Sequence, residues 1–269
     1  MDKFYTTPAI NAERIKKYLK EGKRFDGRKP DEFRNIEVEM DVSNKAEGSV
    51  KVKMGKTEVV VGVKMDVSAP YADSANKGNL MTTSELLPLS SPRFENGPPK
   101  FSAIELGRVI DRGLRESGFI DFEKLCIKEG EKVWTVFVDI YSINDDGNLL
   151  DAAGIGALIA LKNAKMPKYD KETGKVLFGE WTNVKFPTTN VLPLSLTAYK
   201  IGDSIIVDPT REEEDILDTR VTIGISKGII SSMQKGDAKE LSIEEMYRAL
   251  DLIEKTEKEV LKKIGAYIK

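Results

Sequence analysis

Hydrophobic and polar residues alternate along several short stretches of the chain, as they do in strands that bury one face. In the clearest stretch, 133–162, the first apolar side chains occupy every second position: Trp134, Val136, Val138 and Ile140. A turn follows at Asp145–Asn148, because its glycine tolerates positive φ and its Asp and Asn side chains bond nearby backbone groups. From Leu149 the pattern becomes helical, and the small residues Gly154 and Gly156 allow close packing. The sequence therefore predicts a strand, a glycine turn and a helix in succession.

Similar alternation predicts an antiparallel series of strands before this stretch. Two strands are expected around 36–42 and 50–54, and the near-continuous valine run at 57–67 suits a central strand. Ala69–Lys100 holds five prolines and has little periodicity, so we predict a long loop, either a binding loop or a merely mobile excursion. Asn163–Thr189 is predicted to be a polar connector between two halves.

Helices are predicted where apolar residues recur at 3.6-residue spacing. Asn11 is suited to cap a short basic helix that ends at Gly22. A second helix spans Ala103–Glu116, with one apolar face. Four further strands are predicted at Leu194–Ile201, Ser204–Asp208, Val221–Ser226 and Ile229–Met233. After them, Ser242 begins a capping-box sequence that opens a long last helix ending near Gly265.

Strands followed by helices, in two successive halves, predict an α+β fold of two similar lobes, with helices packed on mixed or antiparallel sheets. We expect an N-terminal helix and basic turn at 1–30 and a first lobe at 31–165. A second lobe is expected at 190–260, ending in the C-terminal helix.

Composition narrows the class of protein. A formal net charge of −2 excludes a whole-surface attraction for nucleic acid, so any RNA binding must use a local patch. The chain has no histidine, which removes Ser-His and Cys-His catalysis and imidazole metal sites. One cysteine forms no internal disulfide, and no apolar run is long enough to span a bilayer, so we expect a cytoplasmic protein. Heavy use of Lys and Glu fits a heat-adapted or archaeal source.

Four basic residues on or directly before the second predicted helix are candidates for binding phosphates: Arg108, Arg112, Arg115 and Lys100. The arginines are spaced i, i+4 and i+7 on the side away from the apolar face, where forked guanidiniums are suited to grip successive phosphates. The alternative is a solvated helix face, in which Glu105 pairs with Arg108 and Asp111 pairs with Arg115.

Other charged segments have simpler explanations. Arg24–Arg28 is expected to be a solvated turn with a surface ion pair. The consecutive acids Glu212–Asp215 more often form a solvated face or contact a partner subunit than hold a metal. The turn before Leu149 presents backbone N–H groups to an anion, but Leu149, Leu150 and Asp151 add no favourable charge for one.

Five segments together resemble the RNase PH-like family of phosphorolytic exoribonucleases. They are Arg24–Arg28 (RFDGR), Glu105–Arg115 (ELGRVIDRGLR), Asp139–Ala157 (DIYSINDDGNLLDAAGIGA), Ile206–Thr222 (IVDPTREEEDILDTRVT) and the proline-rich loop before the arginine helix. The NLLDAAG and DPTREEE versions are most similar to the non-catalytic RNase PH-like subunit of the archaeal exosome ring. The resemblance implies a two-lobed βαβα domain in a ring of six, alternating with a catalytic paralogue.

The departures from the catalytic relatives are informative. At the turn those relatives read Asp-Gly-Gly-Ser/Thr-Arg, which holds the attacking phosphate, whereas Leu149 and Leu150 occupy the hydroxyl and arginine positions here. The chain keeps acids at Glu213 and Glu214, but the position of the proposed general acid falls at Arg220. Arginine does not donate a proton at neutral pH. The resemblance also places the three helix arginines on the RNA path between neighbouring subunits, and it favours a role in RNA binding especially for Arg112 and Arg115.

We therefore expect a structural and RNA-positioning subunit that is inactive alone and has no catalytic residue, cofactor or metal of its own. Its expected partners are the catalytic paralogue in an alternating hexameric ring, RNA-binding cap subunits and single-stranded RNA, and not a membrane. One alternative is a phosphorolytic nuclease active by itself through another anion site. A second is an autonomous RNA-binding module without a ring, which the net charge of −2 disfavours.

Overall fold

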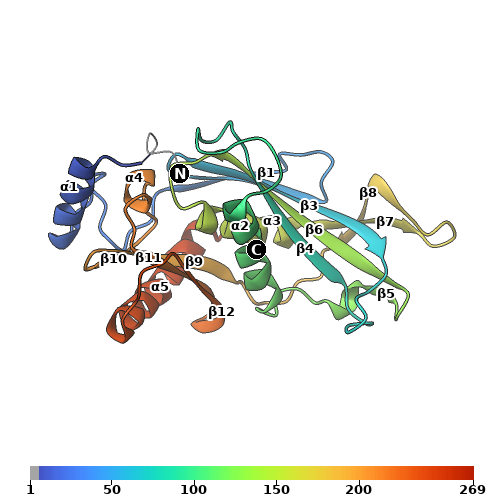
Figure 1. Ribbon diagram of the computed structural model, residues 1–269. Coiled ribbons are helices and arrows are strands. Elements are labelled where there is room, and N and C mark those ends of the chain that lie inside the picture. Colours follow the sequence, from blue (N-terminus) through green and yellow to red (C-terminus); the bar gives the residue numbers. More distant parts are fainter. Residues whose placement is uncertain (1–5) are drawn as a thin grey trace.

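The computed structural model describes residues 6–269. Its first sheet is built around the strand predicted at 133–144, and its strands lie in the order β1-β2-β3-β6-β4, with β5 also paired to β6 (Figure 1). The strands are β1 (Ile36–Met40), β2 (Gly48–Met54), β3 (Thr57–Ser68), β4 (Asn79–Leu86), β5 (Cys126–Lys128) and β6 (Lys132–Asn144). β1, β2, β3 and β6 pair antiparallel, as the alternating pattern predicts, whereas β4 runs parallel to β6.

β4 corrects the prediction of a loop throughout Ala69–Lys100. The strand sequence NLMTTSEL has no regular alternation of apolar and polar residues, and Leu80 is its one large buried side chain. Its strand conformation comes from pairing with β6 over its full length, from Asn79 opposite Thr135 to Leu86 opposite Ser142. Pairing with a distant segment here outweighs a weak local preference.

The second sheet follows the predicted strands closely. It contains β9 (Leu194–Ile201), β10 (Ser204–Val207), β11 (Thr219–Ser226) and β12 (Ile229–Gly236), all antiparallel, in the order β10-β9-β11-β12. The two sheets, with helices packed on them, confirm the predicted α+β class.

The helices cover and separate these sheets. The described residues form α1 (Ala9–Lys20), α2 (Phe101–Arg115), α3 (Leu149–Asn163), α4 (Arg211–Glu214) and α5 (Ile243–Ile264), with a short 3-10 helix at Glu123–Leu125. α1 begins directly after Pro8, whose backbone is extended, so Asn11 lies inside the helix and is not the predicted cap. Ser242 does cap α5, because its hydroxyl accepts the Glu245 N–H at 3.2 Å.

α3 is the helix at the centre of the molecule, between the two sheets (Figure 1). All its residues from Leu149 to Leu161 are buried. A Cβ on Gly156 would lie 2.7 Å from Val61 of β3, and one on Gly154 would lie 3.1 Å from Ser195 of β9. The predicted close packing at both glycines is therefore confirmed, with one glycine against each sheet.

Lys165–Asp170 (β7) and Lys175–Lys185 (β8) form an antiparallel hairpin where the sequence predicts a polar connector. The hairpin projects from the end of the molecule opposite α1 (Figure 1). Within residues 6–269, none of the helices combines the length and the apolar character needed to cross a membrane.

Candidate functional site

The glycine turn between β6 and α3 is the point where the two lobes meet. Gly147 has φ +88° and Asn148 has φ +60°, so both lie in the left-handed region, as the turn chemistry predicts. A Cβ on Gly147 would lie 2.6 Å from the carbonyl oxygen of Pro209. The turn therefore packs directly against the backbone that leads from β10 into α4.

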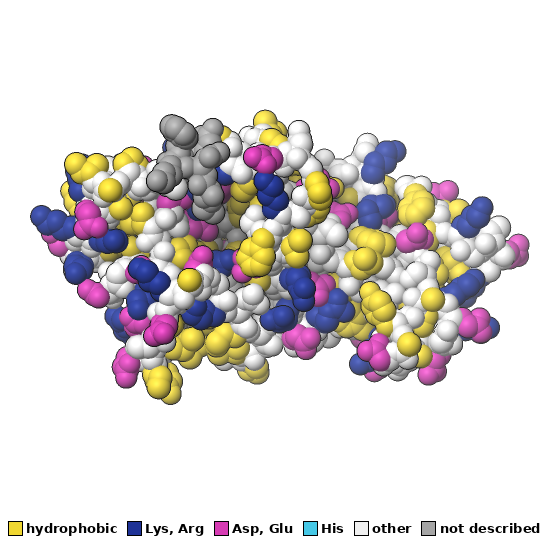
Figure 2. Space-filling model, viewed as in Figure 1, with side chains coloured by type: hydrophobic (Ala, Val, Ile, Leu, Met, Phe, Trp, Pro, Cys, Tyr) yellow, Lys and Arg dark blue, Asp and Glu magenta, His cyan; other side chains and the backbone are white. Residues whose placement is uncertain are grey.

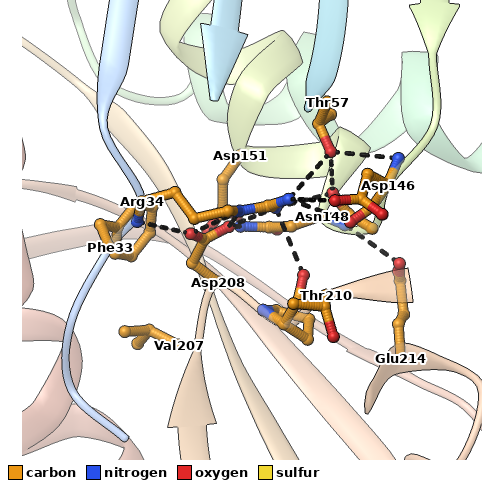
Figure 3. Close-up of polar contacts among 12 residues, drawn as sticks. Phe33, Arg34, Thr57, Asp146, Asn148, Asp151, Val207, Asp208, Thr210 and Glu214 are labelled. Carbon is orange, nitrogen blue, oxygen red and sulfur yellow. Dashed lines mark hydrogen bonds and ion pairs between the residues drawn. The ribbon is translucent and has the colours of Figure 1, made fainter. Parts of the chain in front are cut away.

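Asn148 uses each of its polar groups to hold this junction together (Figure 3). Its backbone N–H donates to Glu214 Oε2 at 3.0 Å. Its side-chain amide donates to Asp151 Oδ2 at 3.1 Å and to Asp208 Oδ1 at 3.0 Å, while its carbonyl oxygen accepts from the Tyr199 hydroxyl at 2.8 Å. One asparagine thus bridges two buried carboxyl groups and a buried phenol.

The Glu214 carboxylate fills the position that the free N–H of this turn offers to an anion. Its negative charge is balanced by Arg211, whose Nη1 lies 3.2 Å from Oε2. Burial raises the pKa of Glu214, against the lowering effect of Arg211. Leu149 and Leu150, which follow the turn, are buried in the hydrophobic core. The anion position is therefore occupied by the protein's own carboxylate and bordered by hydrocarbon.

Asp208 and Arg34 form the charged centre of the junction. Arg34 Nη2 lies 2.7 Å from Asp208 Oδ1 and Arg34 Nε lies 2.9 Å from Oδ2, a two-pronged contact that Arg28 Nη1 supplements at 2.8 Å. Burial acts to raise the pKa of Asp208, but the hydrogen bonds and charge of Arg34, with the charge of Arg28, hold it below its usual value. Arg34 also donates to the Gly147 carbonyl at 3.0 Å, and so ties the turn to β10.

The arginine turn at 24–28 is not the solvated turn that the sequence predicts. Arg24 is buried, and its Nε donates to Glu213 Oε1 at 2.9 Å while its Nη2 donates to the Asp208 carbonyl at 2.7 Å. Arg28 is also largely buried against Asp208. An ion pair within the turn does form, between Arg28 and Asp26 at 2.7 Å, at the edge of this network.

The acidic run 212–215 also differs from its prediction, because most of its carboxylates are paired inside the protein. Glu213 is buried on Arg24, Glu214 caps the glycine turn, and Asp215 accepts two hydrogen bonds from Arg93, one of them at 2.7 Å. Glu213, Glu214 and Asp215 therefore form internal ion pairs and not the predicted solvated face or partner contact, whereas Glu212 is exposed as predicted. Arg93 at the same time fixes the proline-rich segment to α4.

Asp151 is buried without a cation among its hydrogen-bond partners in the described part of the chain. Its carboxyl group accepts from the Thr197 hydroxyl at 2.7 Å and from the Asn148 amide at 3.1 Å. Burial raises its pKa to about 7, and the charge of Asp208 adds to the rise, while these hydrogen bonds oppose it.

The basic residues predicted on α2 differ in how much of their charge is available. Arg108 and Arg112 are exposed, and Arg112 Nη1 donates to Gln234 Oε1 of β12 at 3.1 Å. Arg115 is half-buried, because it donates to Asp111 Oδ1 and to the Leu80 carbonyl, both at 2.9 Å. Figure 2 shows Lys and Arg side chains gathered over the part of the surface where Figure 1 places α2.

The predicted helix-face pairs are half correct. Asp111 pairs with Arg115, but Glu105 pairs with Arg220 of β11 at 2.7 Å and leaves Arg108 without an ion pair in residues 6–269. Lys100, directly before α2, forms an ion pair with Glu95. The structure thus brings the three arginines onto one helix and places Lys100 at its start.

The residues that sequence reasoning missed are those that join the lobes: Arg34, Asn148, Asp151, Asp208 and Tyr199. Two of them carry a signal in the sequence. Asp151 interrupts an otherwise apolar helix, and an acid in such a place needs buried partners. Asn148 follows a turn glycine, where asparagine tolerates positive φ. The other three have no local pattern.

Comparisons with known proteins agree with this architecture. The model of the 3' exoribonuclease family, domain 1, matches residues 32–167, and that of domain 2 matches residues 192–255. The chain is 45% identical over 256 residues to the exosome complex component Rrp42 of Thermococcus onnurineus, covering 94% of this chain and 93% of that protein. It is 48% identical over 227 residues to the Rrp42 component of Methanocella arvoryzae, covering 84% of each.

Solved structures give the same result. A chain of the Archaeoglobus fulgidus exosome with RNA bound to the active site superposes with a TM-score of 0.85 at 43% identity, covering 94% of this chain and 97% of that one. A chain of an archaeal exosome core gives a TM-score of 0.82 at 39% identity, covering 95% and 96%. The predicted RNase PH-like fold is therefore confirmed, and this chain belongs to the 3' exoribonuclease family.

Proposed function

We propose that this chain is a non-catalytic, structural and RNA-binding subunit of a ring-shaped 3'-to-5' phosphorolytic exoribonuclease complex. In the proposed ring it alternates with a catalytic paralogue, which needs it to degrade RNA, and the ring carries RNA-binding cap subunits. The names of its relatives, exosome components of archaea, support membership of such a complex.

The observation that carries the non-catalytic part of the proposal is the occupied turn at Asn148. Phosphorolysis requires inorganic phosphate to be desolvated and aimed at the phosphodiester bond. The Asn148 N–H instead binds Glu214 at 3.0 Å, and Leu149 and Leu150 supply neither a hydroxyl nor a positive charge. A phosphate dianion brought to this place would meet a carboxylate and two leucine side chains.

The position of the proton donor supports the same conclusion. Arg220 is fixed by Glu105 at 2.7 Å and lies 3.7 Å from Asp237. Its guanidinium keeps its proton at any physiological pH, so it stabilises a neighbouring negative charge but performs no general acid catalysis.

The RNA-binding part of the proposal rests on α2. Arg108 and Arg112 are exposed four residues apart on one helix face, about 6 Å along the helix axis, and so are suited to contact neighbouring phosphates. Arg115 and Lys100 already have acidic partners, Asp111 and Glu95. We therefore assign the larger share of phosphate binding to Arg108 and Arg112.

The test compares this chain alone, a catalytic RNase PH-like paralogue alone and the two mixed, each with single-stranded RNA and with or without inorganic phosphate. We expect nucleoside diphosphates from the mixture in the presence of phosphate, and none from this chain alone. Nucleoside diphosphate release by this chain alone would show that it is an enzyme in its own right. Tight RNA binding by a monomer, with no release in any mixture, would show an autonomous binding module.

A second comparison tests the arginines within the assembled ring. The double variant Arg108→Glu, Arg112→Glu should weaken RNA binding and reduce the slope of log affinity against log salt. The slope falls because a protein that contacts fewer phosphates releases fewer counterions. Arg248→Glu, which changes an exposed arginine of α5, is the matched control. Gel filtration of each variant ring shows that assembly is unchanged. Equal RNA retention by all three rings would refute the assignment.

A further inference from the structure

The β7–β8 hairpin has no role in the function proposed above. Residues 168–191 lie between the two family-model matches, so most of the hairpin is outside both matched domains. It projects at the far end of the molecule from α1 and away from α2 (Figure 1). Its features therefore call for an explanation of their own.

Apolar side chains are exposed along β8. Four of them lie within eight residues: Leu177, Phe178, Trp181 and Val184. A soluble chain seldom gathers so many large apolar groups on a projecting hairpin unless they bind something. In Figure 2 the corresponding end of the molecule carries apolar and basic side chains close together.

A bulge in β8 presents the most exposed aromatic ring of the hairpin, that of Phe178. Leu177 lies opposite Lys168 and Trp181 lies opposite Pro167, so residues 178–180 are extra on the β8 side. Gly179 in this bulge has φ +84°. Phe178 beside it is 61% exposed, and Lys64 Nζ of β3 lies 5.1 Å from its ring centroid. The ring is thus held from one side by a cation and remains largely open.

The hairpin is basic in a chain that is acidic overall. Residues 165–185 hold five exposed lysines against three acids, a local net charge of +2 compared with −2 for the whole chain. One lysine of the five, Lys168, is neutralised by Glu180 at 2.9 Å. A further ammonium, that of Lys132, lies at the hairpin turn, where a Cβ on Gly174 would be 3.1 Å from it.

We propose that this hairpin is a second contact site for single-stranded RNA, separate from α2. A base stacks on Phe178, the neighbouring Trp181 borders the stack, and lysines such as Lys175 and Lys185 contact the phosphates. Aromatic rings among unpaired cations are the combination that binds single strands without sequence preference. A protein docking surface has a core depleted of lysine, which differs from this arrangement.

The fluorescence of Trp181 measures the binding of RNA at the hairpin. Trp181 is exposed, whereas Trp134, the other tryptophan, is buried. A base stacked at the hairpin should therefore quench the emission of Trp181. The probe is an unlabelled single-stranded oligouridylate, titrated into the full chain at low salt. Trp181→Phe identifies the share of the quenching that arises at this residue.

The titration is made in the wild-type chain and in the Arg108→Glu, Arg112→Glu variant, so that binding at α2 and binding at the hairpin are measured separately. We expect Trp181 quenching to persist when the α2 arginines are reversed. Adding Phe178→Ala in that background should weaken binding roughly 5- to 150-fold, the effect of one lost base stack. Lys175→Glu with Lys185→Glu should lower the salt slope by about 0.7 per lost phosphate contact.

Val184→Ala is the matched control, because Val184 is 62% exposed on the same strand but has no ring to stack on a base. It should leave the RNA affinity unchanged. Equal losses of RNA affinity from Val184→Ala and Phe178→Ala would show that the Phe178 ring does not stack on a base, and would overturn the proposal. So would unchanged Trp181 emission at saturating RNA. Loss of quenching on reversal of the α2 arginines alone would mean that the hairpin has no site of its own.

Discussion

Asp151→Asn tests whether the buried Asp151 carboxyl group is neutral in the folded protein at pH 5 and ionised at pH 8. The carboxyl group accepts a hydrogen bond from the Thr197 hydroxyl, which lies 2.9 Å from the Thr222 hydroxyl. When Asp151 is protonated, or replaced by Asn, this group donates to the Thr197 oxygen, and the Thr197 hydrogen turns toward Thr222. The Asn148 amide and the Thr197 backbone N–H still find an acceptor oxygen. A neutral side chain is therefore accommodated without loss of packing.

The magnitude follows from the pKa of Asp151. Its ordinary value is 3.8 and burial raises it to about 7, so the folded state binds this proton more tightly than the unfolded state does. Its stabilising contribution is fully present below pH 3.8 and is lost as the pH rises through about 7. The whole difference corresponds to about 4 kcal/mol, of which about 3 kcal/mol is lost between pH 5 and pH 8.

The assay is urea unfolding of both proteins at several pH values from 5 to 8. Tryptophan emission and far-UV circular dichroism should give coincident transitions, which justifies a two-state free energy. Asp208, whose pKa is lowered, contributes stability that is lost only as the pH falls below about 4, outside this range. The wild type should lose about 3 kcal/mol of unfolding free energy through Asp151 between pH 5 and pH 8, and Asp151→Asn should not. We therefore expect the difference in unfolding free energy, Asp151→Asn minus wild type, to be about 3 kcal/mol larger at pH 8 than at pH 5.

Two outcomes would refute this reasoning. If both proteins showed the same pH dependence, Asp151 would not titrate between pH 5 and pH 8 in the folded state, and its pKa would lie outside this range. If Asp151→Asn were less stable than the wild type by a similar amount at every pH, the Thr197 hydroxyl would not reorient as described. The deciding quantity is the change, between pH 5 and pH 8, in the difference in unfolding free energy between the two proteins. The difference at a single pH does not decide the question.

Three further substitutions test other parts of the fold. Arg34→Met should lower the free energy of unfolding by about 3–5 kcal/mol in urea titrations, because it leaves the buried Asp208 carboxylate short of a partner. Gly147→Ala should cost at least about 2 kcal/mol in thermal melts, since its Cβ would lie 2.6 Å from the Pro209 oxygen; a smaller loss would mean that the lobes move apart easily. Ser242→Ala should cost about 1 kcal/mol and Ser242→Gly only a few tenths, and equal losses would contradict the capping assignment.

The periodicity of apolar residues predicted much of the fold because burial is a local property of the sequence. The apolar face of α2 and the alternating residues of β6 all lie in the core where the spacing places them. The same reasoning failed for β4 and for the β7–β8 hairpin. Neither has a regular apolar repeat, and each becomes a strand through its partner, β6 for the first and the other arm for the second.

The charged junction was harder to predict because its partners are far apart in the chain. Arg34 and Asp208 are 174 residues apart, and Arg24 and Glu213 are 189 apart. The composition of the 24–28 turn gives its charge but not its burial. Each charged segment was therefore expected to be solvated, whereas the two segments neutralise each other in the interior. Among the candidate RNA-binding residues, the i, i+4 spacing predicted the pair of Arg115 with Asp111, but the hydrogen bond from Arg115 to the Leu80 carbonyl of β4 has no local signal in the sequence.

The anion position at the Asn148 N–H is occupied by a side chain of the protein itself. Glu214 forms an ion pair with Arg211 and accepts the Asn148 N–H, so its carboxylate is part of the folded structure. An arginine placed at Leu150 would bring a charge to a largely buried position, and a phosphate at the Asn148 N–H would have to displace a carboxylate already held by its own chain. Displacing that carboxylate would break a contact that joins the lobes. The backbone N–H that this turn would offer to a phosphate therefore helps, in this chain, to hold the two halves together.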